Sequence, residues 1–89
     1  MKTPVYTNRF KRDYRLMLKR GKAEARFASV AERLLAGLPL DHRHQDHPLK
    51  GEFTGWRDCH LEANWILIYR PTETSVIFGR TGTHSDIFG

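Results

Sequence analysis

The feature that most constrains this chain is its longest apolar run, Trp65-Ile66-Leu67-Ile68-Tyr69. The run is far shorter than the ~20 apolar residues of a membrane-spanning helix, and it is typical of one buried strand. The chain of 89 residues is 39% hydrophobic and 28% charged, which is the profile of a globular protein. We therefore expect one folded domain over residues 1–89, with a single small core and no membrane segment.

Two further features narrow the class of protein. The segment Met1-Lys2-Thr3-Pro4 lacks the apolar stretch of a signal peptide. Cys59 is the only cysteine, so neither an intramolecular disulfide nor a cysteine-based zinc site is available. The sequence thus predicts a small soluble protein of the cytoplasm.

The first half of the chain predicts one strand and two helices. Residues 2–6 form a short strand, which Pro4 restricts to a sheet edge or to the start of the strand. Apolar residues then recur at helical spacing over residues 8–20 and again over 22–36, and Gly21 separates the two helices. Two helices joined in this way need a sheet to cover their apolar faces.

The second half predicts a polar loop followed by strands. Residues 38–48 are rich in histidine, and candidate strands follow at 49–53, 56–62, 64–70 and 75–80. The connections are short, so neighbouring strands run antiparallel. The expected fold class is α+β: an N-terminal strand, a two-helix hairpin and an antiparallel β-meander, forming a single sheet with the helices on one face.

Alternation along residues 56–62 predicts which side chains face away from the helices. Cys59 and Leu61 suit the helix-covered core, so Asp58 and His60 should lie side by side on the opposite, open face. A carboxylate beside an imidazole is either a surface ion pair or a site in which the carboxylate tunes the histidine.

The net charge of +5 and the isoelectric point near 9.8 favour a polyanionic partner, of which nucleic acid is the most abundant. Eight Lys or Arg residues but only two acidic ones lie between residues 9 and 26. This basic segment is a solvated helix face, a nucleic-acid track or a docking surface for an acidic protein.

Five histidines are a high density for 89 residues, and three of them, His42, His44 and His47, lie in the loop. With Asp41 or Asp46 they would supply zinc ligands, but their spacing matches no zinc motif, so we expect no metal site. His42 and His44 are better interpreted as residues of a surface loop. His47 directly precedes a predicted strand and is the best anchored of the three.

The segment 80–89 carries both a histidine and a large aromatic residue, which a frayed tail rarely does. Either Ile87 and Phe88 pack into the core, or the segment folds over the open face and brings His84 and Phe88 beside His60. In the second arrangement Phe88 would stack on an RNA base.

Metal-free RNA cleavage needs groups for two proton transfers and a cation, and the chain offers His47, His60 and His84 with Asp58 and Arg80. One group removes the proton from the 2′-hydroxyl, which attacks the adjacent phosphorus, and another protonates the departing 5′-oxygen. Imidazoles suit both roles because their pKa lies near working pH. A cation stabilises the charge on the phosphorane.

Four motifs in this order resemble one known family. They are Asp46-His47-Pro48-Leu49-Lys50-Gly51, Gly55-Trp56-Arg57-Asp58-Cys59-His60, Asn64-Trp65-Ile66-Leu67-Ile68-Tyr69, and Arg80-Thr81-Gly82-Thr83-His84 with Phe88-Gly89. Together with the basic helical hairpin and the chain length, they resemble the YafQ branch of the RelE/ParE toxin superfamily. The resemblance covers the whole chain and implies a RelE-like, microbial-RNase-like α+β fold.

The resemblance further implies the toxin of a bacterial type II toxin–antitoxin system. Such toxins are mRNA interferases, which enter the A site of the 30S ribosomal subunit, cleave the message there without a metal or other cofactor, and so inhibit translation. The implied partners are the ribosome, mRNA and a cognate antitoxin that wraps and neutralises the toxin. Operator DNA would be bound only through the toxin–antitoxin complex.

Position by position, the resemblance assigns the active site to His47, Asp58, His60, His84 and Phe88. His84 is the expected general acid, and His60 or His47 is the expected general base. Asp58 would orient a histidine, and Phe88 would hold a base of the codon.

Asn64 stands where we expect an aspartate in close relatives. An asparagine forms hydrogen bonds but exchanges no proton at neutral pH, which leaves Asn64 an auxiliary role. The cations expected to contact RNA or the ribosome are Arg12, Arg15, Lys19, Lys50, Arg57 and Arg80.

Three other functions are alternatives. A ParE-like toxin that poisons DNA gyrase would not need the histidine–aspartate cluster. A non-catalytic nucleic-acid-binding module would depend on the basic helices and tolerate the loss of His84, and a metal-binding regulator using residues 41–47 would respond to a chelator. The density of histidines around Asp58 favours RNA cleavage.

Overall fold

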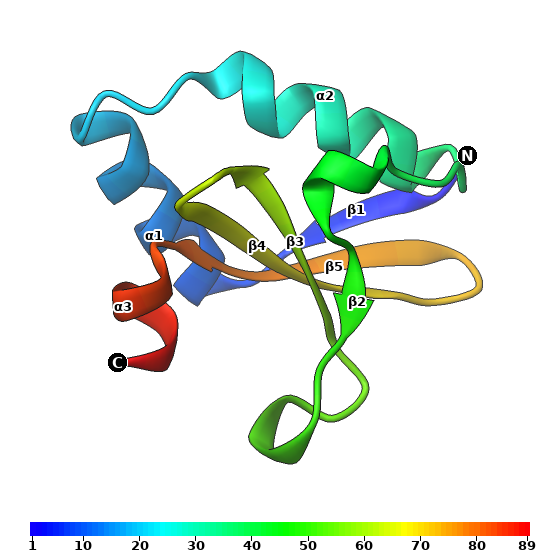
Figure 1. The fold of residues 1–89 in the computed structure, drawn as a ribbon. Helices are drawn as coiled ribbons and strands as arrows, with labels where there is room; N and C mark the ends of the chain where they lie inside the picture. The colour runs from blue at the N-terminus through cyan, green and yellow to red at the C-terminus, as the bar shows by residue number, and fades with distance from the viewer.

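The computed structural model describes residues 1–89 and contains one five-stranded sheet with helices packed against it (Figure 1). In chain order the elements are β1 (Thr3–Tyr6), α1 (Asn8–Lys19), α2 (Glu24–Leu35), the 3₁₀-helix η1 (His42–His44), β2 (His47–Pro48), the 3₁₀-helix η2 (Gly51–Phe53), β3 (Arg57–Glu62), β4 (Trp65–Pro71), β5 (Ser75–Gly82) and α3 (His84–Phe88). None of the helices is both long and apolar enough to cross a bilayer. The expected α+β class is confirmed.

The strand order across the sheet is β1-β5-β4-β3-β2. Strands β2 to β5 pair antiparallel with their neighbours, as their short connections predicted, whereas β1 pairs parallel with β5. Residues Thr3 to Tyr6 lie opposite Ser75 to Phe78. As Pro4 predicted, β1 is an edge strand, because proline has no N–H to offer a second neighbour.

The helical hairpin covers one face of the sheet. The Thr7 hydroxyl caps α1 by accepting a hydrogen bond from the N–H of Phe10, 3.0 Å away. Gly21, with φ of 90°, turns the chain after α1, and α2 begins at Glu24, two residues later than predicted. Both helices send apolar side chains into the core, where Phe10 meets Phe27 and Phe78.

Strand β4 is buried on both faces. Its residues Trp65 and Leu67 lie in the helix-covered core, and Ile66 and Ile68 on the other face are 2% and 1% exposed. The prediction of a buried strand is therefore confirmed. The second face is not bare, however, since these two isoleucines are also shielded from water.

Two elements differ from the sequence-based prediction. The predicted strand at 49–53 is wrong: β2 is His47–Pro48, and Gly51–Phe53 forms η2. Gly51 adopts φ of 66°, which turns the chain out of the sheet after Leu49 has made a last backbone hydrogen bond to Trp56. The C-terminal segment 84–88, for which no helix is predicted, folds into α3.

Candidate active site

A row of side chains crosses four strands on the face opposite the helical hairpin. The register places His47 of β2 opposite Asp58 of β3, Asp58 opposite Ile68 of β4, and Ile68 opposite Arg80 of β5. The next row contains His60, Ile66 and Gly82. Paired residues share a face of the sheet, so two predicted histidines, Asp58 and Arg80 lie together.

His47 and Asp58 form the closest contact within this row. The His47 Nδ1 atom lies 3.1 Å from Asp58 Oδ1, and the Asp58 side chain is only 6% exposed. The same Nδ1 atom lies 2.7 Å from the carbonyl oxygen of Gln45. A carbonyl only accepts hydrogen bonds, so Nδ1 carries a hydrogen directed at Gln45, and Asp58 Oδ1 has no hydrogen-bond partner despite the short distance.

His47 and His60 present the same ring nitrogen. The Nδ1 atom of His60 lies 3.2 Å from the carbonyl oxygen of Ala63, which again requires a hydrogen on Nδ1. In the neutral state Nε2 then carries the lone pair in both His47 and His60. Each imidazole is held by a backbone carbonyl with its basic nitrogen free.

Asp58 lies at the electrostatic centre of the site. Burial raises the pKa of its carboxyl group, and the nearby imidazoles of His47, His60 and His84 oppose this shift in part. All three predicted catalytic histidines are thus close enough to interact with one carboxylate.

Helix α3 brings the remaining two predicted residues. The Asn64 carboxamide oxygen accepts a hydrogen bond from the backbone N–H of His84, and the His84 and Phe88 ring centroids are 5.1 Å apart. Phe88 also packs edge-to-face on Phe53 of η2, with centroids 5.8 Å apart, and remains 39% exposed. Packing of Phe88 into the core is therefore the wrong alternative, because the ring lies on the surface.

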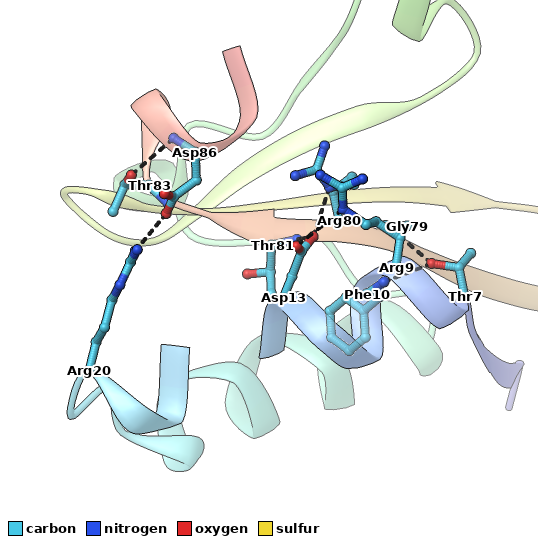
Figure 2. Close-up of polar contacts among 10 residues, drawn as sticks. All are labelled: Thr7, Arg9, Phe10, Asp13, Arg20, Gly79, Arg80, Thr81, Thr83 and Asp86. Carbon is cyan, nitrogen blue, oxygen red and sulfur yellow. Dashed lines mark hydrogen bonds and ion pairs between the residues drawn. The ribbon is translucent and has the colours of Figure 1, made fainter. Parts of the chain in front are cut away.

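A capping box and an ion pair fix α3 to the rest of the molecule (Figure 2). The Thr83 hydroxyl accepts from the N–H of Asp86, whose carboxylate accepts from the N–H of Thr83. Arg20, at the end of α1, donates to Asp86 Oδ2 at 2.8 Å. A Cβ atom at Gly82 would lie 2.9 Å from Asp86 Cβ, so glycine allows the helix to approach β5.

Arg80 is oriented by the first helix (Figure 2). Pairing with β1 ends at Phe78, so the edge of β5 beyond it is open, and Asp13 of α1 fills this gap. Its Oδ2 atom accepts from Arg80 Nε at 2.7 Å and from the N–H of Thr81 at 3.2 Å. Arg9 lies 3.5 Å from the other oxygen of Asp13.

Arg57, an expected RNA contact, forms an ion pair with Asp46 within the molecule. It lies on the other face of β3, where its Nε donates to Asp46 Oδ1 at 3.2 Å, and Tyr69 donates its hydroxyl hydrogen to the same oxygen at 2.6 Å. Burial and this bond raise the pKa of Tyr69, which stays a donor. Asp46 immediately precedes His47, so the pair Arg57 and Tyr69 fixes the backbone that carries His47. The sequence analysis missed Tyr69, and it considered Asp46 only as a zinc ligand and not as a support for His47.

The other predicted cations lie elsewhere. Arg12, Arg15 and Lys19 are exposed on α1 around a shallow groove that also contains Leu16 and Leu18. Lys50 is exposed between β2 and η2. The structure therefore separates a basic surface on α1 from the histidine site.

The candidate zinc ligands of the loop do not converge. No three His, Cys, Asp or Glu side chains are arranged to hold a metal ion. His42 is exposed, while His44 Nδ1 bonds to the carbonyl oxygen of His60 at 2.6 Å and so braces the end of β3. Cys59 is fully buried, and burial raises the pKa of its thiol, so it offers no thiolate.

Comparison with known proteins agrees with this geometry. Residues 2–89 match the family described as "Bacterial toxin of type II toxin-antitoxin system, YafQ". The chain is 40% identical over 85 residues to the mRNA interferase toxin YafQ of Escherichia coli K12, covering 94% of this chain and 92% of that protein.

Solved structures show the same fold. The crystal structure of YafQ from E. coli BL21(DE3) superposes with a TM-score of 0.93 at 37% identity, over 100% of both chains. YafQ in the E. coli DinJ–YafQ toxin–antitoxin complex gives a TM-score of 0.91 at 38% identity, over 99% of this chain and 98% of that one. The chain, with its RelE-like sheet and its histidine row, therefore belongs to the YafQ family of bacterial toxins of type II toxin–antitoxin systems.

Proposed function

We propose that this chain is a ribosome-dependent mRNA endoribonuclease, which cleaves the message in the ribosomal A site by metal-independent acid–base catalysis and so inhibits translation. The observation that carries the proposal is the buried carboxylate of Asp58 with His47, His60 and His84 around it. The E. coli relative bears the name mRNA interferase toxin, which supports the same activity.

In the first step, an imidazole removes the proton from a 2′-hydroxyl. His60 and His47 both present Nε2 with its lone pair, because Nδ1 of each is bound to a carbonyl oxygen. The freed 2′-oxygen attacks the adjacent phosphorus, and a pentacoordinate phosphorane forms. Asp58 stabilises the imidazolium that results, since it lies beside both rings.

In the second step, the bond between phosphorus and the 5′-oxygen breaks. His84, at the exposed start of α3, donates the proton that the departing 5′-oxygen takes up. Arg80 supplies positive charge near the phosphorane, and Asp13 fixes the direction of its guanidinium group. The products are a 2′,3′-cyclic phosphate and a 5′-hydroxyl, so one proton is removed and one is returned.

Two features connect this chemistry to the ribosome. Phe88 offers an exposed ring beside His84, on which a base of the codon stacks. The basic surface of Arg12, Arg15 and Lys19 lies apart from the site and is free to contact ribosomal RNA while the site holds the message.

We assign the chain two further interactions. Its cytoplasmic partner is a cognate antitoxin, as in the E. coli DinJ–YafQ complex, and operator DNA is bound only through that complex. No metal takes part in the proposed mechanism, because imidazoles perform both proton transfers.

The test is cleavage of a defined mRNA by the purified chain, with and without programmed ribosomes. We expect cleavage only on ribosomes, 2′,3′-cyclic phosphate ends, and a loss of roughly a hundredfold or more in His84→Ala. His42→Ala removes an exposed histidine outside the site and is the matched control.

Chelation provides a second readout of the same reaction. EDTA, with ribosome integrity verified, should leave the cleavage rate unchanged. Full activity in His84→Ala, or loss of activity in EDTA on intact ribosomes, would contradict the mechanism. If the folded chain cleaves nothing in either condition, the activity itself is wrong, and inhibition of gyrase becomes the next assay.

A further inference from the structure

A cleft of about 720 Å³ lies between α2, η1 and the end of β3, and His60 is the one predicted catalytic residue that lines it. The 3₁₀-helix η1, which precedes β2 and is green in Figure 1, lies next to α2 here. Arg26 and Ser29 of α2 form one wall, and Arg43 and His44 of η1 form the other. No step of the proposed mechanism uses these residues.

The charge of the cleft is positive. Glu62 is its one acidic residue, and two cations already neutralise it: Lys22 at 3.1 Å and Arg26 at 3.7 Å. The Arg43 guanidinium group makes neither an ion pair nor a hydrogen bond within the molecule; only the Arg43 backbone N–H is bonded, to Asp41. Arg43 is therefore a free cation, carried by η1 and lining the cleft.

His60 connects the cleft to the active site. Its side chain lines the cleft, and it also stands in the row next to Asp58. The carbonyl oxygen of His60 accepts from His44 Nδ1 at 2.6 Å, so the cleft wall and the catalytic strand are joined directly. A polymer that passes His60 in the site would continue into the cleft.

We propose that this cleft binds the phosphodiester backbone of the RNA strand that flanks the scissile bond, with Arg43 as its phosphate contact. The inference rests on the proposed function, since it extends the same RNA beyond the site. Seven of the ten lining residues are polar, and two of these are arginines, which suits a phosphate backbone. The core of a protein–protein interface is more apolar, so an antitoxin segment fits this cleft less well.

The test measures binding to ribosomes programmed with a defined mRNA, in a His84→Ala background that keeps the message intact. Arg43→Gln removes the free cation and should weaken binding roughly three- to tenfold. Arg70→Gln removes an exposed arginine at the far end of β4 and is the matched control. Circular dichroism and thermal unfolding confirm that both variants fold.

A neutral linkage then locates the contact. The message carries one methylphosphonate, with a 2′-O-methyl group beside it for stability, at each flanking position in turn. At one position this change should weaken binding of the parent protein by the factor seen for Arg43→Gln, and it should have no further effect on Arg43→Gln itself.

Three results would overturn the proposal. In the first, the weakening by Arg43→Gln and the weakening by the methylphosphonate multiply at every position. Independent effects of this kind would show that Arg43 contacts none of these phosphates. Another is binding of Arg43→Gln equal to that of the Arg70→Gln control. The third is weakened antitoxin binding with unchanged message binding, which would assign the cleft to a protein. Failure of the proposed function has a different signature, because it is read from cleavage and this test is read from binding.

Discussion

The Asn64 carboxamide oxygen accepts a hydrogen bond from the backbone N–H of His84, with the two heavy atoms 3.3 Å apart. The first N–H groups of a helix have no partner within the helix, so Asn64 satisfies one of them and fixes the start of α3. At position 64 the chain therefore needs an acceptor. A proton-transfer group is not required there for this contact.

Substitution of Asn64 tests this interpretation. Asn64→Asp keeps an acceptor oxygen and adds a negative charge at a helix N-terminus, so the cleavage rate should stay within about threefold of the parent. Asn64→Leu has similar size but no acceptor, and should reduce kcat by roughly tenfold because His84 is displaced. Single-turnover cleavage on programmed ribosomes measures both. A new ionisation in the pH–rate profile of Asn64→Asp would show that a carboxyl group there takes part in proton transfer.

Asp58 should contribute to activity at the expense of stability. Burial raises its pKa, so its contribution to folding is greatest below its unfolded pKa of about 4 and is lost as pH rises through the folded value. Asp58→Asn should therefore gain stability relative to the parent between pH 4 and pH 7, while cleavage falls by roughly a hundredfold. Urea unfolding at the two pH values measures the first effect. If Asp58→Asn lost more unfolding free energy relative to the parent at pH 7 than at pH 4, the prediction would be wrong.

Tyr69 should act on catalysis through Asp46. Tyr69→Phe removes the hydroxyl that donates to Asp46 Oδ1 and should cost about 1 kcal/mol of unfolding free energy. It should also lower kcat several-fold, roughly three to ten, with KM unchanged, since His47 follows Asp46 directly. Tyr6→Phe, which removes a hydroxyl from an exposed side chain, is the control. If Tyr69→Phe lowered stability but left kcat at the parent value, Tyr69 would support the fold and not catalysis.

The ion pair between Arg20 and Asp86 should make α3 sensitive to acid. The hydrogen bond from Arg20 lowers the pKa of Asp86 to about 2, so its stabilising contribution is present above pH 4 and is lost as pH falls through 2. Arg20→Gln should raise that pKa and destabilise the protein by roughly 0.5–1 kcal/mol at pH 7. Carbon-13 NMR titration of the Asp86 carboxyl group, with Lys11→Gln as control, measures the shift. An unchanged midpoint would mean that the pair is not formed in solution.

The basic surface of α1 should govern affinity for the ribosome. Reversing Arg12, Arg15 and Lys19 to glutamate should weaken binding and flatten its salt dependence, by about one unit of log–log slope for each phosphate that the variant no longer neutralises. Arg70→Glu reverses one exposed arginine on β4 and is the control for a charge reversal outside this surface. Equal affinity of the triple variant and the control at low salt would rule out this surface as the ribosome contact.

Local patterns predicted the parts of this fold that depend on neighbouring residues. The alternation that places Cys59 in the core and Asp58 opposite it was correct, because side chains of a strand alternate whatever their partners. The run from Trp65 to Tyr69 was correctly identified as a buried strand. Gly51 was the signal overlooked in the predicted strand at 49–53, since its positive φ ends the extended conformation.

Contacts between distant segments could not be predicted in this way. Nothing near Thr3 specifies a parallel partner at Ser75, and nothing near Asp46 points to the hydroxyl of Tyr69, 23 residues away. Helix α3 is too short for apolar periodicity, although Thr83 and Asp86 have the spacing of a capping box. Residue chemistry gathered the three histidines as candidates for RNA cleavage, and the resemblance to a family then assigned them to one active site.

The parallel pairing of β1 with β5 has a consequence for how the toxin is made. Strand β1 is translated first, but its pairing partner β5 is translated some seventy residues later. His84 and Phe88 come after β5 in the chain. A nascent chain interrupted before residue 75 lacks β5, and therefore lacks both the partner of β1 and the segment that carries His84 and Phe88. Because β1 pairs only with this late strand, the sheet is completed only after nearly the whole chain has been translated.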